Sequence, residues 1–264
     1  MIVSVDGVAA HASTGGIELS GSDPVVVLIH GAGMDSTVWQ LQTRYLAHRG
    51  FRAVAVDLPG HGRSAGEALG SVEAMADWVA RFVAAAGFDA VHVVGHSMGT
   101  FIALELAGRH AAIVRSITLC GTATAMPVHP DLLDAAARDL PAAAALMASW
   151  GHDKPAHLGV NPTPGLWMLG GARALVENSA PGVLTADFGA CVAYANATTA
   201  ASAVTCPATV IIGLGDRMTP PKSGRALAAA LPSARVVELA GTGHSMMTEN
   251  PRAVKQAILS AVST

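Results

Sequence analysis

Aromatic side chains and charge are both scarce in this sequence. Phe, Trp and Tyr make up 4% of its 264 residues, and Asp, Glu, Lys and Arg together make up 13%. The 16 basic and 19 acidic residues give a formal net charge of -3, with no basic stripe and no block of like charge. We therefore expect neither a nucleic-acid-binding protein nor a polybasic attachment to membranes.

Cysteines and long apolar runs are scarce as well. Cys120, Cys191 and Cys206 are odd in number and widely spaced, which argues against a disulfide framework and a C-x-x-C metal pair and favours free thiols. Although 51% of the residues are hydrophobic, no run of about 18 to 20 uncharged apolar residues occurs, so no membrane-spanning helix is expected. Residues 1–13 lack the basic start and long apolar core of a signal peptide, which favours a cytoplasmic protein.

What the sequence does contain is a repeated unit of a short apolar run, a glycine-containing turn and a helical pattern. The apolar runs are continuous rather than alternating, which indicates strands buried on both faces, as in a parallel sheet covered by helices. They lie at residues 24–30, 51–56, 90–94, 114–119, 208–214 and 234–239, with helical patterns at about 37–48, 71–86, 98–110, 221–231 and 250–262. Residues 2–19 are expected to add one or two antiparallel edge strands. The pattern predicts an α/β fold with a doubly wound, mostly parallel sheet.

The alternation is interrupted once, between two late strands. Residues 127–200 hold helical patterns at 131–138, 142–150 and about 187–203, a Pro/Gly-rich middle at 161–165, and no convincing buried strand. Because such a segment is too long for a plain connection, we interpret it as a helical cap over the carboxyl edge of the sheet. The predicted division is a core domain of residues 1–126 and 201–264 and a cap of residues 127–200.

Residues 95–99, with the sequence Gly-His-Ser-Met-Gly, follow one apolar run and open a helical pattern. This is the strand, sharp turn and helix context in which the G-x-S-x-G motif presents a nucleophilic serine, here Ser97. Glycines flank the serine because the turn is strained and the helix packs close to the strand. An ordinary Gly-Ser loop is the alternative interpretation.

A serine needs a base to take its proton and a third group to hold that base. His244 follows the last apolar run, after two glycines and just ahead of the final helical pattern. Asp216 ends the preceding strand, and its alternative role is an N-terminal cap for the helix beginning near residue 220. The other strand-end loop, residues 120–126, has no Asp or Glu, so Ser97, Asp216 and His244 are the candidate catalytic residues.

Attack on a carbonyl places negative charge on oxygen, which needs preorganised N–H donors. The backbone amide of Met98, at the helix start after the serine, is one candidate. The second is expected in the glycine-containing loop of residues 30–34, from Ala32 or Gly33, with Ala32 favoured. A plain strand-to-helix turn is the alternative for this loop.

These motifs in this order resemble the α/β-hydrolase superfamily, in its capped single-domain branch of esterases, carbon-carbon bond hydrolases and perhydrolases. The resemblance covers nearly the whole chain outside the cap and includes the D-x-P-G-x-G-x-S segment at residues 57–64. It implies a Ser97, Asp216 and His244 triad with Ala32 and Met98 as oxyanion donors. Members with an aspartate nucleophile, the haloalkane dehalogenases and epoxide hydrolases, are disfavoured by Ser97. In the 57–64 segment we interpret Asp57, His61 and Arg63 as mainly turn-forming.

The residues around the predicted site are largely apolar. Candidates for substrate binding, each of which could equally be a core residue, are Met34, Met126, Met147, Trp150, Trp167 and Met246. The cations of the cap, Arg138, Lys154 and Arg173, are not clustered, which disfavours a dicarboxylate or phosphorylated substrate. An uncharged, apolar small-molecule substrate is therefore expected.

The sequence thus predicts a serine hydrolase that cleaves a carboxylic ester or related acyl compound through an acyl-enzyme. Carbon-carbon bond hydrolysis and cofactor-free perhydrolysis or haloperoxidase activity use the same three residues and remain alternatives. A ligand-binding receptor on the same scaffold is an alternative of a different class. No metal or organic cofactor is expected, because the histidines are not grouped in ligand spacing and Gly31 and Gly33 lack the third glycine of a dinucleotide loop. The oligomeric state is left open.

Overall fold

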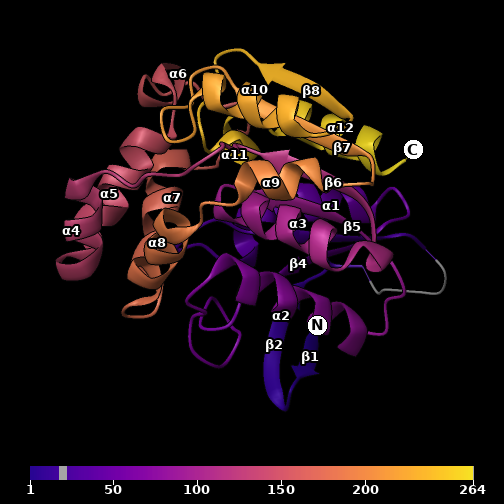
Figure 1. Ribbon diagram of the computed structural model, residues 1–264. Helices are drawn as coiled ribbons and strands as arrows, with labels where there is room; N and C mark the ends of the chain where they lie inside the picture. The colour runs from indigo at the N-terminus through magenta and orange to yellow at the C-terminus, as the bar shows by residue number, and fades with distance from the viewer. Residues whose placement is uncertain (18–22, 264) are drawn as a thin grey trace.

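One eight-stranded sheet organises the computed structural model, which describes residues 1–17 and 23–263 (Figure 1). Its spatial strand order is β1-β2-β4-β3-β5-β6-β7-β8. The strands are β1 (Ile2–Val5), β2 (Val8–Ser13), β3 (Val25–Ile29), β4 (Arg52–Val56), β5 (Val91–His96), β6 (Val114–Cys120), β7 (Ala208–Gly213) and β8 (Ala234–Leu239). The six strands β4, β3, β5, β6, β7 and β8 run parallel to one another. Strand β2 pairs antiparallel with β1 on one side and with β4 on the other. The predicted α/β fold with a mostly parallel sheet is confirmed.

The antiparallel edge is a hairpin that turns at Asp6 and Gly7. Both residues have positive φ, 52° and 83°, as a two-residue turn of type I′ requires. The edge strands expected in residues 2–19 are therefore present, although residues 18 and 19 of that range lie outside the described part.

Helices cover both faces of the sheet, which is why its strands are apolar throughout. On β3, Val25, Val27 and Ile29 join one buried cluster, whereas Val26 and Leu28 join a second. The first face is covered by α2 (Val72–Ala85), α3 (Met98–Arg109), α9 (Ala197–Ser202) and α10 (Pro221–Ala230). The second carries η1 (Ser36–Trp39), α1 (Gln40–Ala47), α11 (Met246–Glu249) and α12 (Pro251–Val262), and a short turn η2 (Ala111–Ile113) precedes β6.

The chain between β6 and β7 forms a helical insert, which lies to the left of the sheet in Figure 1. Its helices are α4 (Pro130–Arg138), α5 (Leu140–Gly151), α6 (Lys154–His157), α7 (Met168–Glu177) and α8 (Val183–Ala193), and α9 follows them before β7. The division into a core and a cap of residues 127–200 stays a prediction. Its second boundary falls inside α9, which packs on α3 and α10 of the core.

The insert differs from the sequence pattern in three places, one of which is the short helix α6, where no helical pattern was expected. The helical pattern at about 187–203 is two helices, because Tyr194 takes an extended conformation at the end of α8. Helix α7 was not expected, since Gly170 and Gly171 lower its intrinsic helix propensity. Gly170 lies against the Trp167 indole, which occupies the space a Cβ would need, so packing explains this glycine. In the part of the chain that the structure describes, no helix is long and apolar enough to cross a membrane.

Candidate active site

Ser97 lies at a strained turn between β5 and α3, at the carboxyl edge of the sheet. It has φ 52° and ψ -120°, an unfavourable region for a residue with a side chain. The turn is possible only with small neighbours: a Cβ on Gly95 would collide with the backbone of Gly99, and a Cβ on Gly99 would lie 2.5 Å from the carbonyl oxygen of Ile29. On the facing loop, a Cβ on Gly31 would come within 3.2 Å of Ser97 Cβ. The glycines therefore hold the Ser97 hydroxyl close to the loop of residues 30–34.

His244 and Asp216 form a buried pair beside this turn. His244 Nδ1 donates to Asp216 Oδ2 over 2.8 Å, and the two residues are 2% and 3% exposed. Thr219 Oγ1 donates to the same oxygen over 2.7 Å, and the amides of Met218 and Thr219 donate to Oδ1, both over 2.8 Å. Space beside the pair is limited, because a Cβ on Gly121 would lie 3.1 Å from His244 Nδ1. With Nδ1 donating to the carboxylate, His244 Nε2 makes no hydrogen bond to any residue that the structure describes.

The surroundings of Asp216 keep its carboxyl ionised. Burial raises the pKa of this carboxyl, but the charge of His244 and the hydrogen bonds from His244 and Thr219 outweigh burial and leave the pKa below its usual value. An ionised carboxylate fixes the ring of His244 and stabilises it when it becomes protonated.

A second histidine, His96, supports the backbone of His244. Its Nε2 donates to the carbonyl oxygen of His244 over 3.0 Å, and the two rings lie 4.6 Å apart. Burial and the nearby charge of His244 lower the pKa of His96 to about 3, so it stays neutral. The G-x-S-x-G motif does not indicate this role, although His96 occupies the variable position before Ser97.

Ser97 and His244 line the same small cavity, of about 30 Å³. Within the described residues the Ser97 hydroxyl makes no hydrogen bond, so the serine and the imidazole are neighbours without being bonded. Contacts between nucleophile and base are often loose in the absence of substrate.

The two candidate amides of the oxyanion loop have different surroundings. The Gly33 amide donates to Asp187 Oδ2 over 2.8 Å, so it is already engaged. No hydrogen bond from the Ala32 amide occurs among the described residues, and Ala32 lines the cavities that Ser97 lines. Met98 is the first residue of α3, where an amide has no partner inside the helix. The geometry thus leaves Ala32 and Met98 as the donors available to an anion at Ser97.

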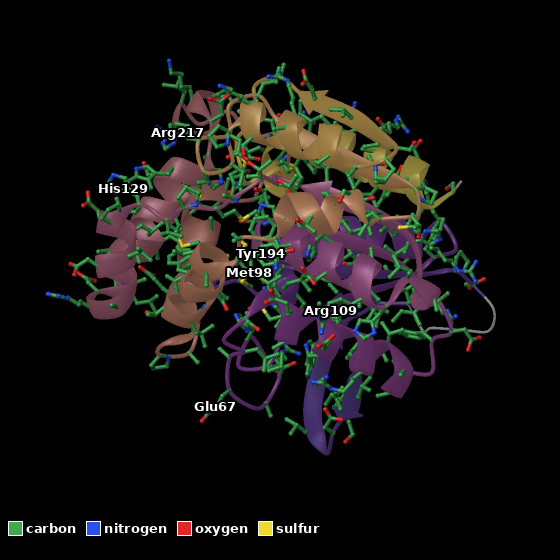
Figure 2. The ribbon with its side chains drawn as sticks, viewed as in Figure 1. Glu67, Met98, Arg109, His129, Tyr194 and Arg217 are labelled. Carbon is green, nitrogen blue, oxygen red and sulfur yellow. The ribbon has the colours of Figure 1, made fainter. Side chains whose placement is uncertain are left out.

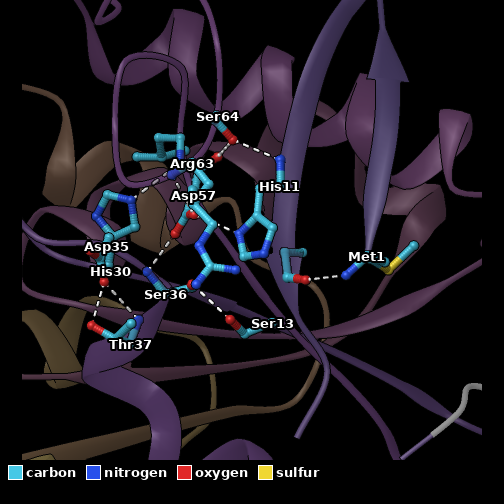
Figure 3. Close-up of polar contacts among 12 residues, drawn as sticks. Met1, His11, Ser13, His30, Asp35, Ser36, Thr37, Asp57, Arg63 and Ser64 are labelled. Atoms are coloured by element: carbon cyan, nitrogen blue, oxygen red, sulfur yellow. Dashed lines mark hydrogen bonds and ion pairs between the residues drawn. The ribbon is translucent and has the colours of Figure 1, made fainter. Parts of the chain in front are cut away.

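Asp57 is the centre of a polar cluster that joins β2 to the loops after β3 and β4 (Figure 3). It accepts the amides of Ser36 and Arg63 over 2.6 and 3.0 Å and His11 Nδ1 over 2.7 Å. Burial raises the pKa of its carboxyl, but these hydrogen bonds lower the pKa below its usual value. Asp57 is 1% exposed, in agreement with the turn-forming role expected for it.

His61 has a different role, because it joins the insert to the core. Its Nε2 lies 2.9 Å from Asp187 Oδ2 on α8, and its Nδ1 lies 2.9 Å from the carbonyl oxygen of Pro59. Both partners only accept, so both ring nitrogens donate when His61 is protonated, and the pair is then an ion pair. Burial lowers the pKa of His61, but Asp187 outweighs burial and raises it above its ordinary value. Asp187 is 0% exposed, and its Oδ1 has no hydrogen-bond partner among the residues that the structure describes; no sequence motif indicated this link.

The larger cavity beside Ser97 has a volume of about 560 Å³ and mostly apolar walls. Of the residues expected to bind substrate, Met126 and Trp150 line it, whereas Met34 and Met147 line the small cavity. Phe188 also lines the larger cavity, Leu132 and Met218 are wall residues that no sequence pattern indicated, and exposed His129 and Arg217 lie on the insert side (Figure 2).

Two of the expected binding residues lie elsewhere. Trp167 is 78% exposed and lines a separate hollow of about 110 Å³, together with Met34. Met246 is 0% exposed, packs in the cluster on the opposite face of the sheet, and is not among the residues lining the cavities at Ser97. Within residues 1–17 and 23–263, no group of three or more His, Cys, Asp or Glu side chains is arranged to hold a metal ion.

Comparison with known proteins gives matches over the whole fold. Pimeloyl-[acyl-carrier protein] methyl ester esterases from Chromobacterium violaceum and Aromatoleum aromaticum are 30% and 31% identical to the chain, over 87% and 86% of it and 90% and 94% of their own lengths. A Methylococcus capsulatus protein of that name is 44% identical over 111 residues, which span only 40% of either protein. Among solved structures, the enol-lactonase from Burkholderia xenovorans superposes with a TM-score of 0.89 at 25% identity and covers 100% of both chains.

Two further neighbours share the fold at lower identity. A thermophilic esterase from Thermogutta terrifontis has a TM-score of 0.83 at 24% identity, and a bromoperoxidase from Bacillus anthracis has 0.85 at 16%. The model of the alpha/beta hydrolase family matches residues 26–257, which is most of the chain. These residues span the parallel part of the sheet from β3 to β8, the insert and the candidate site, and the match confirms the resemblance that the motifs indicated. The chain belongs to the alpha/beta hydrolase family.

Proposed function

We propose that this hydrolase is a serine esterase that cleaves an uncharged carboxylic ester through an acyl-enzyme on Ser97. The observation that carries the proposal is the buried His244–Asp216 pair, 2.8 Å apart, next to a cavity that His244 shares with Ser97. A hydroxyl on a strained turn, an imidazole held by a carboxylate, and two free amides together supply the parts needed for acyl transfer.

The first half of the reaction forms the acyl-enzyme. Ser97 Oγ attacks the ester carbon while His244 Nε2 takes its proton, and negative charge develops on the carbonyl oxygen. The amides of Ala32 and Met98 stabilise that charge, since neither has another acceptor among the described residues. His244 then gives the proton to the leaving alcohol, and Asp216 stabilises the imidazolium in between.

The second half releases the acid. Water takes the place of the alcohol, His244 removes its proton, and the hydroxide attacks the acyl carbon. Collapse of this intermediate frees the carboxylic acid and returns the proton to Ser97. Removing one oxyanion donor typically lowers kcat by about 10²–10³-fold, so the two amides make a large contribution to the proposed rate.

The walls of the larger cavity favour an apolar acyl group. Met126, Leu132, Trp150 and Phe188 line a volume of about 560 Å³. Cavities of about 300–1,000 Å³ with mainly hydrophobic walls are typical of small-molecule sites. The curated relatives bear the name of an ester hydrolase, which supports ester cleavage by this chain as well.

The proposal is tested by hydrolysis in a pH-stat of uncharged methyl and ethyl esters and of matched esters whose acyl chain ends in a carboxylate. We expect turnover of the uncharged esters, a marked loss with the charged acyl chain, and no measurable turnover by Ser97→Ala or His244→Ala. Ser202→Ala, at an exposed serine at the end of α9, is the matched control and is expected to retain full activity.

Other outcomes would replace the proposal. Undiminished ester hydrolysis by Ser97→Ala would refute it, and equal rates with charged acyl chains would refute the apolar pocket. Faster cleavage of a diketone than of any ester would favour a carbon-carbon bond hydrolase, and faster transfer to hydrogen peroxide than to water would favour a perhydrolase. Tight ligand binding with turnover far below the usual range of about 1–10³ s⁻¹ would favour a receptor.

A further inference from the structure

The space around Ser97 is divided into two cavities of very different size. One measures about 560 Å³ and the other about 30 Å³, and Ser97 and Ala32 line both. His244 lines the small cavity and is not among the residues that line the large one. The base therefore faces one side of the nucleophile, and most of the free volume lies on the other.

The chemistry of ester cleavage assigns a substituent to each side. The imidazolium must reach the leaving oxygen to protonate it, so the alcohol part of the ester lies on the His244 side. The carbonyl oxygen faces the amides of Ala32 and Met98. The acyl chain is the remaining substituent on the carbonyl carbon, and it extends away from His244 into the large cavity.

We infer that the substrates are esters of a small alcohol, methanol or ethanol, with a large apolar acyl group; this inference rests on the proposed function. The small cavity, about 30 Å³, has less than a tenth of the volume of the large one, about 560 Å³. The small side therefore suits a one- or two-carbon alcohol, and then the water that replaces it. Met147 and Ala148 of α5 wall this side, and there is little slack at Gly151, where a Cβ would lie 3.2 Å from Ser245 Oγ.

The bonds that form and break in the reaction are consistent with placing the alcohol in the small cavity and the acyl chain in the large one. Ser97 Oγ bonds to the acyl carbon, the bond from that carbon to the alkoxy oxygen breaks, and the alkoxide leaves with the Ser97 proton delivered by His244. The small alcohol departs from the small cavity while the acyl chain stays in the large one. Water then enters where the alcohol was, so deacylation requires no movement of the acyl chain.

Two series of esters test the inference. In the first, the acyl group is octanoyl and the alcohol is methanol, ethanol, butanol or hexanol; in the second, the alcohol is methanol and the acyl group runs from acetyl to octanoyl. We expect kcat/KM to fall at least tenfold from the methyl to the butyl ester. With acyl length we expect a rise of up to about fourfold per methylene, which corresponds to about 0.8 kcal/mol per buried methylene.

A pair of variants locates the two subsites. Met147→Ala enlarges the small cavity, so the ratio of butyl to methyl ester activity is expected to rise about tenfold while the acyl profile keeps its shape. Leu132→Ala is the matched truncation in the large cavity, and it is expected to change the acyl profile and leave the alcohol ratio unchanged. The wild-type series decides the question alone should either variant fail to fold.

The outcomes separate this inference from the proposed function. A wild-type preference for bulky alcohols with short acyl groups, or equal rates along the alcohol series, overturns the inference while Ser97-dependent hydrolysis stands. Absence of hydrolysis of every ester in both series overturns the proposed function instead.

Discussion

Replacing Asp187 by asparagine tests whether its pair with His61 holds the insert on the core. Both side chains are almost fully buried, at 0% and 1% exposure, and their atoms are 2.9 Å apart. Asparagine keeps the shape of the side chain and can still accept the Gly33 amide, so the variant removes mainly the negative charge.

The expected loss of stability is substantial. Removing one partner of a buried ion pair typically costs about 3–5 kcal/mol, and we expect the lower end because His61 can lose its proton. At about 2–4 °C per kcal/mol for a chain of this size, 3 kcal/mol corresponds to a fall in Tm of roughly 6–12 °C. Asp134→Asn is the matched control in the insert, since its ion pair with Arg138 is exposed, and it is expected to change stability by less than about 1 kcal/mol.

The effect should also depend on pH in a stated direction. The folded protein raises the pKa of His61, so the pair contributes fully below about pH 6.5, the value for unfolded histidine, and its contribution is lost as pH rises through the folded pKa. The neighbouring His30 does not interfere, because burial and the charge of His61 hold its pKa at about 4.

The assay is thermal or urea unfolding followed by far-UV circular dichroism at about pH 6 and about pH 9. We expect the gap between wild type and Asp187→Asn to be larger at about pH 6 and to shrink at about pH 9. Equal stability of the two proteins at both pH values, or a gap that widens with pH, would refute the reasoning.

Two further substitutions act nearer the chemistry. Gly99→Ala places a Cβ 2.5 Å from the Ile29 carbonyl oxygen and is expected to lower kcat by about 100-fold. A Cβ on Gly108 in the same helix would meet no described residue within 4 Å, so Gly108→Ala should leave kcat unchanged; equal kcat values for the two variants would contradict this. Thr219→Val removes the 2.7 Å hydrogen bond to Asp216 and is expected to lower kcat/KM about tenfold, the equivalent of about 1.4 kcal/mol, and an unchanged value would show that this hydroxyl has no role in holding the carboxylate.

The strands could be predicted from the sequence because burial on both faces leaves a continuous apolar run. Residues 208–214, for example, were expected as a strand, and β7 is Ala208–Gly213. Helix α7 could not be predicted in the same way, because its two glycines suit the contact with Trp167 rather than helix formation. The break after α8 is also a tertiary feature, since Tyr194 donates to Glu105 Oε1 on α3 over 2.7 Å.

The candidate catalytic residues were predictable because each follows a strand, and parallel strands bring their carboxyl ends to one edge. The structure places Asp216 and His244 in contact and Ser97 on the same cavity. The link between His61 and Asp187 was not predictable, because it joins residues 126 positions apart and depends on how the insert docks. Met246 was expected at the site because it is close to His244 in sequence. The structure instead buries it in α11, in the cluster on the other face of the sheet.

The central claim is that Ser97 is the nucleophile and that His244 activates it. It is tested most directly by labelling the native protein with a fluorophosphonate and locating the adduct by peptide mass spectrometry. We predict a single adduct on Ser97, none in Ser97→Ala, and much slower labelling in His244→Ala. An adduct on another residue, together with ester turnover that persists in Ser97→Ala, would contradict the claim.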